Sequence, residues 1–95
     1  MKNSIKTAKQ IERHMKGVAN HWRIEILLFI NKNSGATLDE ISDGLKMNIK
    51  TASEHARRLA QAGLINKTYA GRQVQHTLSP YGKLFISFIT TFQHS

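Results

Sequence analysis

The stretch NIKTASEHARRLAQAGLI, at positions 48–65, holds the side chains whose types and spacing could do chemistry. Lys50, Ser53 and Arg57 recur at intervals of three and four residues, which places them on one face if the segment is helical. Small apolar residues, Ala52 and Ala56, fall on the other side. Ammonium, hydroxyl and guanidinium groups in such a row form hydrogen bonds and ion pairs with an extended polar or anionic surface. The stretch therefore predicts a binding surface.

Catalytic chemistry is not favoured anywhere in the chain. The sequence has no Cys nucleophile, no His-Glu-x-x-His motif and no glycine-rich phosphate loop. Ser53 and His55 are two residues apart, so on a helix their side chains point in different directions. His55 flanks the apolar stripe and is expected to pack there. We expect no enzymatic activity and no cofactor.

Composition places the chain among ordinary globular proteins. Its 95 residues suit one domain, and 40% are hydrophobic while 21% are charged. The absence of Cys excludes disulfides and is compatible with a reducing cytosol. The longest apolar run, Ile24–Ile30, is interrupted by Glu25 and is too short to cross a bilayer, and the N-terminal residues lack the apolar region of a signal peptide. We expect a cytoplasmic protein without membrane contact.

The net charge of +8 is unevenly distributed. Residues 1–23 carry +5, residues 24–45 carry −3 and residues 46–72 carry +5. Segregated positive charge creates a field that attracts a polyanion. Basic residues that merely solvate an exposed face would give the same totals, so charge alone leaves both interpretations open.

Apolar spacing predicts four helices in the first two thirds of the chain. The second of them is apolar nearly all round, so it is expected to form the centre of the core. Thr37 and Glu40 form a capping box at the start of the third. The predicted ranges are residues 4–17, 20–31, 38–45 and 49–62.

The third and fourth helices are separated by a tight turn at Lys46 and Met47, and Asn48 caps the fourth. Gly63 supplies its C-terminal stop. Two short helices joined in this way, the second narrow inside and basic outside, are typical of a helix-turn-helix with a recognition helix. A small helical bundle with a solvated face is the alternative.

The remaining segments favour the helix-turn-helix. Leu64–Tyr69 and Val74–Leu78 are β-prone runs joined by a turn in which Gly71 provides a positive φ. Ser79 and Pro80 then begin a last helix, as N-cap and first residue. The predicted fold is mainly α with a β-hairpin wing: a single winged helix-turn-helix domain over residues 1–95, with five helices in the order α-α-α-α-β-β-α.

The sequence resembles the ArsR-like winged helix-turn-helix regulators over roughly residues 18–82. Arg23-Ile24-Glu25-Ile26-Leu27 resembles the Arg-x-x-Ile-Leu helix of that family. Thr51-Ala52-Ser53-Glu54-His55, followed by Ala62-Gly63-Leu64-Ile65, resembles its recognition helix and the exit from it. Gly71-Arg72-Gln73-Val74 matches the Gly-Arg-x-Val of the wing, and Leu78-Ser79-Pro80-Tyr81-Gly82 is similar to a segment that follows the wing in MarR-like relatives.

Three residues depart from the family pattern. Arg58 stands where Leu is usual, Ala56 replaces a larger apolar residue, and Lys46 replaces a turn Gly. A left-handed conformation at Lys46 would cost roughly 1 kcal/mol. We expect a diverged member with its own packing.

The metal sensors of the family carry ligands that this chain lacks. Thr37 and Asp39 occupy the positions of their Cys ligands, and no Asp or Glu occurs after Glu54. His76 and His94 are the only possible ligands in the last part of the chain, and they fall on different predicted elements. A zinc site needs three or four convergent ligands. We therefore expect no metal site, and the sequence identifies no small-molecule effector.

Two hypotheses for function remain. The first is a sequence-specific transcriptional regulator that binds double-stranded DNA as a homodimer, with residues 49–62 in the major groove and a wing of residues 66–77 at the backbone and minor groove. The alternative is a winged-helix module that docks onto a protein partner or coats DNA without sequence preference. The candidate DNA-binding residues are Asn48, Lys50, Thr51, Ser53, Glu54, Arg57, Gln61, Lys67, Arg72 and Gln73.

The first and last helices are expected to form a dimer interface. Both carry apolar stripes, and a core already filled by the middle helix leaves little room for them. The resemblance implies the same pairing of terminal helices. The candidate interface residues are Ile5, Ala8, Ile11, Met15, Phe85, Phe88, Ile89 and Phe92.

Overall fold

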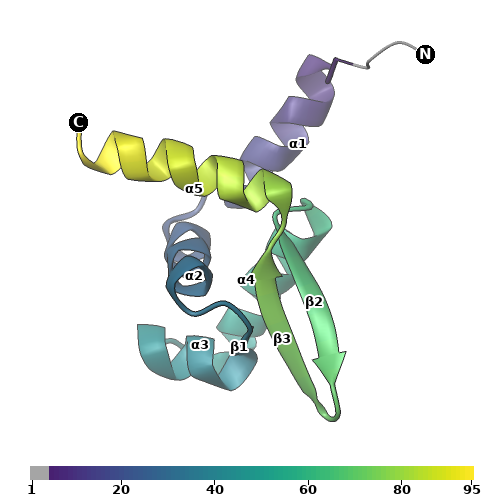
Figure 1. Ribbon diagram of the computed structural model, residues 1–95, viewed down its shortest axis with the longest axis vertical. Coiled ribbons are helices and arrows are strands. Elements are labelled where there is room, and N and C mark those ends of the chain that lie inside the picture. The colour runs from purple at the N-terminus through teal and green to yellow at the C-terminus, as the bar shows by residue number, and fades with distance from the viewer. Residues whose placement is uncertain (1–4) are drawn as a thin grey trace.

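The computed structural model describes residues 5–95 of the chain. Within that range the chain forms five helices and three strands, and a β-hairpin projects from the helical core (Figure 1). The predicted fold class and order of helices and hairpin are confirmed. The elements are α1 (Ala8–Val18), α2 (His21–Lys32), β1 (Ala36–Thr37), α3 (Leu38–Leu45), α4 (Ile49–Gln61), β2 (Ile65–Ala70), β3 (Gln73–Leu78) and α5 (Pro80–Gln93).

Helix α2 is the centre of the core, as its apolar pattern predicts. It begins at Asn20, whose side-chain oxygen accepts hydrogen bonds from the backbone amides of Trp22 and Arg23 at 2.9 and 3.2 Å. The helix contacts α3, α4, α5 and β3. Its fully buried residues are Ile26, Leu27 and Ile30.

Helices α3 and α4 form the predicted helix-turn-helix. The Thr37–Glu40 capping box is present, with both reciprocal hydrogen bonds. Helix α3 ends at Lys46, whose backbone is in the left-handed conformation with φ 54° and ψ 47°. Gly adopts this conformation more easily than Lys, so the turn places Lys46 in an unfavourable backbone conformation. Asn48 then caps α4 by accepting hydrogen bonds from the amides of Lys50 and Thr51.

Strands β2 and β3 form the wing, a regular antiparallel hairpin. Their register runs from Ile65 opposite Leu78 to Ala70 opposite Gln73. The strands are therefore one residue longer at the tip than the sequence pattern suggested, and the loop between them has two residues. It begins at Gly71 with φ +65°, which a two-residue turn of this kind requires at its first position.

A third strand, β1, was not predicted. Ala36 and Thr37 pair with His76 and Gln75 of β3, which gives the sheet the order β1-β3-β2. Two residues are too few for an alternating pattern, and the pairing depends on where the chain returns some 40 residues later. The short strand fixes the wing to the start of α3.

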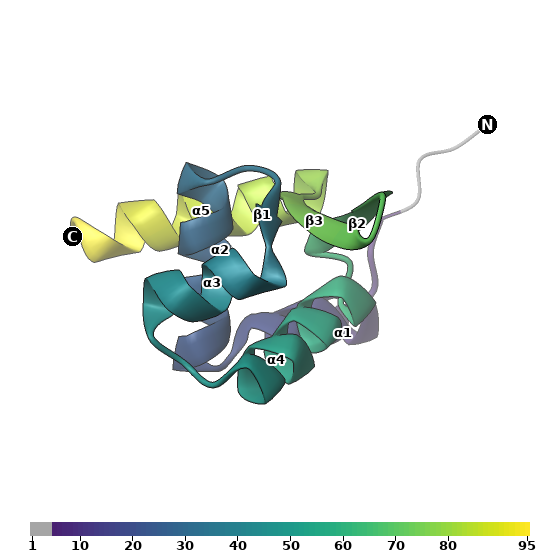
Figure 2. The ribbon, with the colours of Figure 1, turned by 90° about the horizontal axis from the view of Figure 1, so that it is seen from below.

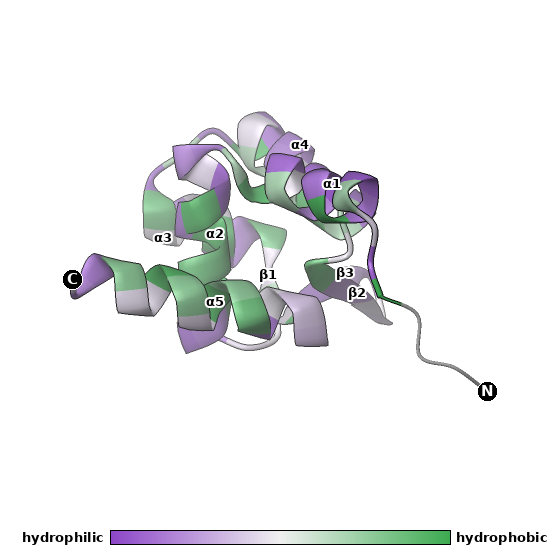
Figure 3. Ribbon diagram, turned by 90° about the horizontal axis from the view of Figure 1, so that it is seen from above, coloured by the Kyte–Doolittle hydropathy of each residue, from purple (hydrophilic) through white to green (hydrophobic). Residues whose placement is uncertain are grey.

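Helix α1 lies beside the C-terminal half of α4 (Figures 2 and 3). The close approach requires Gly17, because a Cβ there would collide with the Cβ of Ala62. His14 Nδ1 is 2.7 Å from the Ala62 carbonyl oxygen and donates a hydrogen bond to it. The His14 ring also packs on that of Tyr81 in α5, with centroids 4.9 Å apart. His14 therefore links α1 both to the end of α4 and to α5.

The first helix starts later than predicted. Thr7 is its N-cap and forms a capping box with Gln10, so the helix begins at Ala8. Ile5 precedes the helix and is 89% exposed, so it does not extend the apolar stripe as expected. The first residue of the predicted range, residue 4, lies outside the described residues. The pattern of apolar spacing missed the capping box, which sets the boundary.

Candidate nucleic-acid interface

The outer face of α4 presents polar side chains to the solvent. Ala52, Ala56 and Leu59 are buried against the core, which turns the opposite side outward. Ile49 has the spacing of this buried stripe, but it is 43% exposed because it lies in the first turn, at the edge of a hollow. All ten candidate DNA-binding residues are exposed.

Glu54 lies at the centre of a small ionic cluster on this face. Its carboxylate accepts hydrogen bonds from Arg57 Nη2 at 2.6 Å and Nε at 3.3 Å, and from Arg58 Nε at 3.0 Å. These hydrogen bonds, that of Arg57 above all, lower the pKa of Glu54 to about 2. Among the described residues, Glu54 forms ion pairs with Arg57 and Arg58 and not with Lys50, which lies one turn earlier.

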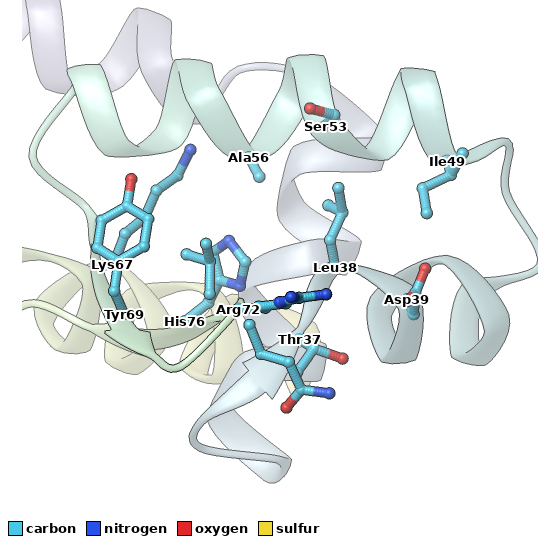
Figure 4. Close-up of a pocket in the computed structure, with 12 residues that line it drawn as sticks. Thr37, Leu38, Asp39, Ile49, Ser53, Ala56, Lys67, Tyr69, Arg72 and His76 are labelled. Carbon is cyan, nitrogen blue, oxygen red and sulfur yellow. The ribbon is translucent and has the colours of Figure 1, made fainter.

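A hollow of about 340 Å³ separates α4 from the wing. We call it the wing hollow. Figure 4 shows side chains of β2 and of the wing tip extending into it, with Lys67 pointing toward α4 and the Arg72 guanidinium lying near the start of α3. Two cationic side chains, those of Lys67 and Arg72, and one carboxylate, that of Asp39, line it. The polar and charged residues that line it are Thr37, Asp39, Ser53, Lys67, Tyr69, Arg72, Gln73 and His76.

A second hollow, of about 310 Å³, lies on the opposite side of α4, against α1 and α2. We call it the α1 hollow. No carboxylate lines it. Arg23 donates hydrogen bonds through Nη1 to the carbonyl oxygens of Lys16 and Gly17, at 3.4 and 3.1 Å, and so holds the end of α1 on α2. The residues that line the hollow are Arg13, Lys16, Gly17, Arg23, Arg58, Gln61 and Ala62.

Two histidines near α4 pack within the fold: His76 is buried and His55 is half-buried. His76 donates a hydrogen bond from Nδ1 to the Ala36 carbonyl, 2.8 Å away, and so joins β3 to β1. Burial lowers its pKa; the hydrogen bond to Ala36 opposes that effect, and Lys67 adds to it. Burial is also the main cause that lowers the pKa of His55, and the positive charge of Arg23 lowers it further. His55 packs beside the buried stripe of α4, as predicted.

Residues 5–95 offer neither a candidate metal centre nor a candidate membrane span. This part of the chain contains no group of three or more His, Cys, Asp or Glu side chains that could hold a metal ion. His76 and His94 lie in β3 and at the end of α5, on separate elements as expected. None of the described helices has the length and apolar character needed to span a bilayer.

Apolar side chains remain exposed on the two terminal helices. Phe88 and Phe92 of α5 are 60% and 72% exposed, and their rings stack with centroids 5.7 Å apart. Met15 of α1 meets α5 at a shallow apolar hollow of about 210 Å³, lined by Met15, Leu84, Phe85 and Phe88. Figure 3 shows the contrast between apolar α5 and polar α4. Of the other candidate interface residues, Ala8 and Ile11 are exposed, whereas Phe85 and Ile89 are partly buried against the core.

The candidate DNA-binding residues therefore divide into groups around α4. Ser53, Lys67, Arg72 and Gln73 share the wing hollow, and Gln61 lines the α1 hollow. Glu54 and Arg57 are bonded together on the outer face between the two. Lys50 and Thr51 line neither hollow, and the side-chain oxygen of Asn48 is used by the helix cap.

The basic side chains of the α1 hollow were not among the predicted site residues. Arg13, Lys16 and Arg23 belong to the N-terminal segment whose charge of +5 was noticed without a site being assigned to it. Arg58 was noticed as a departure from the family pattern. The charge of the N-terminal segment and the unusual Arg58 were both visible in the sequence, but only the packing of α1 on α4 brings these basic side chains together.

Comparison with known proteins supports the fold. Residues 21–66 match the family model of winged helix-turn-helix DNA-binding segments. The match spans α2 to the start of β2 and so includes the helix-turn-helix itself. A comparison with curated proteins gives no match.

Several solved structures are similar over most of the chain. The homodimeric winged helix-turn-helix DNA-binding domain of Mb0332 from Mycobacterium bovis, a possible ArsR-family transcriptional regulator, is 21% identical with a TM-score of 0.82, covering 98% of this chain and 91% of that one. HlyU from Vibrio cholerae is 24% identical with a TM-score of 0.83, covering 97% and 100%. A MarR protein from Peptoclostridium difficile is 20% identical with a TM-score of 0.77, covering 90% and 57%.

These likenesses show a common fold. The winged helix-turn-helix fold predicted from the sequence is confirmed, and the chain shares this fold with a possible ArsR-family regulator and with a MarR protein.

Proposed function

We propose that this chain is a sequence-specific transcriptional regulator that binds double-stranded DNA as a homodimer, with α4 in the major groove and the wing at the backbone and minor groove. The observation that carries the proposal is the exposed polar face of α4 beside a cationic wing. The major groove admits an α-helix, and its floor displays a distinct pattern of donors and acceptors for each base pair. The same proposal places the protein in the cytoplasm.

The proposed contacts follow from the chemistry of each side chain. Lys50, Ser53, Glu54 and Arg57 are assigned to base edges, with Arg57 suited to guanine and Glu54 to the cytosine amino group. Thr51 and Gln61 are assigned to the backbone, as are Lys67 and Gln73 of the wing. Arg72, at the wing tip, is assigned to the minor groove or its edge. Asn48 retains its amide NH2 for a phosphate while its oxygen caps the helix.

The homodimer is proposed from the apolar faces of the terminal helices. Phe88 and Phe92 are too exposed to contribute to the core of one subunit. Pairing α1 and α5 with those of a second copy about a two-fold axis would bury them, together with Ile11 and Met15. Mb0332, which has the same fold, is itself a homodimer. Two copies would present two α4 helices, so the DNA target would be a palindrome.

Selection of bound DNA from a random pool tests the proposal. We expect a recovered palindrome whose half-sites are about one helical turn, or a multiple of it, apart. Its complex should be roughly 10³-fold or more tighter than that with random competitor DNA at physiological salt. Recovery of no preferred sequence, with equal binding to all duplexes, would instead favour a DNA-coating protein. Absence of binding to any duplex would favour the alternative of a module that docks onto a protein.

A further inference from the structure

We propose that the α1 hollow is a second binding site for DNA phosphates, which holds the backbone on the side of the major groove opposite the wing. This inference rests on the proposed function, because it assumes that α4 enters the groove. It adds α1, an element so far assigned only to the dimer interface, to the DNA-binding surface. The residues proposed to contact phosphate are Arg13, Lys16 and Arg58.

The geometry of α4 places the two hollows on either side of its outer face. At 3.6 residues per turn, Ser53 and Arg58 project about 60° and 80° to opposite sides of Lys50. Ser53 lines the wing hollow and Arg58 lines the α1 hollow. A major groove is bounded by two sugar-phosphate backbones, so a helix within it has phosphates on both sides. The wing is positioned to reach only one of these backbones.

The charge around the α1 hollow suits a phosphodiester. Four cationic side chains line it, from α1, α2 and α4, and no carboxylate does. The nearest carboxylates are those of Glu12, 3.3 Å from Lys16 Nζ, and Glu54, 3.0 Å from Arg58 Nε. Both pairs are largely exposed, so water and a competing anion can reach them.

Individual donors remain available in the hollow. Glu54 engages Arg58 only through Nε, and the terminal nitrogens of Arg58 have no hydrogen bond within residues 5–95. Arg23 Nε is buried and likewise has no partner in this part of the chain. A buried donor without a partner is unfavourable, and a water bound to it would relieve that cost. Planar guanidinium groups match the geometry of phosphate oxygens.

The fold holds this site firmly against α4. Gly17 allows α1 and α4 to touch, and His14 hydrogen-bonds across the contact. Arg23 fixes the last turn of α1 through two backbone carbonyls. We therefore treat Arg23 as a positioning residue. Arg13 and Lys16, by contrast, are exposed, so they can be replaced without loss of packing.

The test measures affinity for the selected operator and for random duplex at several salt concentrations, with wild type, Arg13→Ala, Lys16→Ala and the double variant. Each single substitution should reduce the slope of log K against log salt by about 0.9, which corresponds to a roughly eightfold loss at 0.1 M salt on both DNAs. Lys32→Ala, an exposed cation at the end of α2 that lines neither hollow, is the charge-matched control and should leave the slope unchanged.

A scan with methylphosphonates, which remove the charge of one phosphate at a time, locates the contact. Wild type should lose affinity at positions on both backbones of the recognition groove. The Arg13→Ala Lys16→Ala variant should become less sensitive on one backbone only, where Arg58 remains, and Lys67→Ala should become less sensitive on the other only. A double variant with the wild-type slope and scan, or one that matches Lys32→Ala, would overturn the inference while leaving the proposed function intact. Failure of wild type to bind any duplex would instead remove the proposed function on which the inference rests.

Discussion

The Glu54 carboxylate holds the Arg57 guanidinium through two hydrogen bonds, from Nη2 at 2.6 Å and Nε at 3.3 Å. It therefore occupies two of the five donors that Arg57 could offer to a guanine base. Arg58 is bonded to the same carboxylate. Because the pKa of Glu54 lies at about 2, mainly owing to Arg57, the carboxylate stays charged at any pH used for binding. The outer face of α4 is thus less cationic than its arginines alone suggest.

Glu54→Gln is expected to strengthen non-specific binding and to reduce discrimination. Removal of the carboxylate frees two arginines for phosphates, so the salt slope on random DNA should steepen by up to about two units. The ratio of operator to random affinity should fall, since Glu54 also repels phosphate and is proposed to accept a hydrogen bond from cytosine. Fluorescence anisotropy with both duplexes measures this. Unchanged affinity for random DNA would show that the arginines do not face DNA.

Phe88→Glu and Ile11→Glu are each expected to give a monomer with weakened DNA binding. Both side chains are exposed in one subunit and are proposed to be buried in the dimer, where a carboxylate without a partner is strongly unfavourable. Sedimentation velocity at tens of micromolar measures the oligomeric state. Thr91→Glu, at another exposed position of α5, is a suitable control. A monomeric wild-type protein at these concentrations would contradict the dimer.

Folding stability is expected to fall on acidification because of His76. Burial lowers its pKa in the folded state, so the neutral form is favoured there. Its contribution is fully present above the unfolded pKa of about 6.5 and is lost as the pH falls through the folded value. Urea unfolding at pH 7.5 and 5 measures the dependence. His76→Asn should flatten it, although not abolish it, because burial also lowers the pKa of His55. The control is His94→Asn, at the exposed end of α5.

Zinc, nickel and copper are expected not to change DNA affinity. The His, Asp and Glu side chains of residues 5–95 do not gather into a group that could hold a metal ion. Titration of the protein–DNA complex with zinc, with and without a chelator, provides the measurement. A shift of more than tenfold that follows stoichiometric metal binding would reveal a site.

Local chemistry made much of the fold predictable. The caps at Asn20, Asn48 and Ser79 act over three residues, so the sequence alone places the starts of α2, α4 and α5. The left-handed conformation of Lys46 followed from the family resemblance, because Lys46 stands where that family has a turn Gly. The start of α1 was equally local, but apolar spacing was followed past the capping residue Thr7.

What the sequence could not predict depends on contacts between distant segments. Strand β1 exists because β3 returns to pair with Ala36 and Thr37. The α1 hollow exists because Gly17 lets α1 approach Ala62, 45 positions later. Similarly, Ile49 fits the apolar period of α4, yet the core does not extend to its first turn. Periodicity shows which side of a helix is apolar; it does not show how far along the helix a neighbour covers that side.

The most direct test of sequence-specific recognition by α4 compares Arg57→Ala with Arg72→Ala on operator and random DNA. Arg57→Ala should cost about 1–3 kcal/mol on the operator and relax specificity at one base position. Arg72→Ala should weaken binding to operator and random DNA more evenly, and it should make the slope of log K against log salt shallower by about one unit. We therefore predict that Arg57→Ala reduces sequence specificity, whereas Arg72→Ala reduces affinity for DNA of any sequence. Equal losses on operator and random DNA for both variants would contradict it and leave α4 as a charged surface without base recognition.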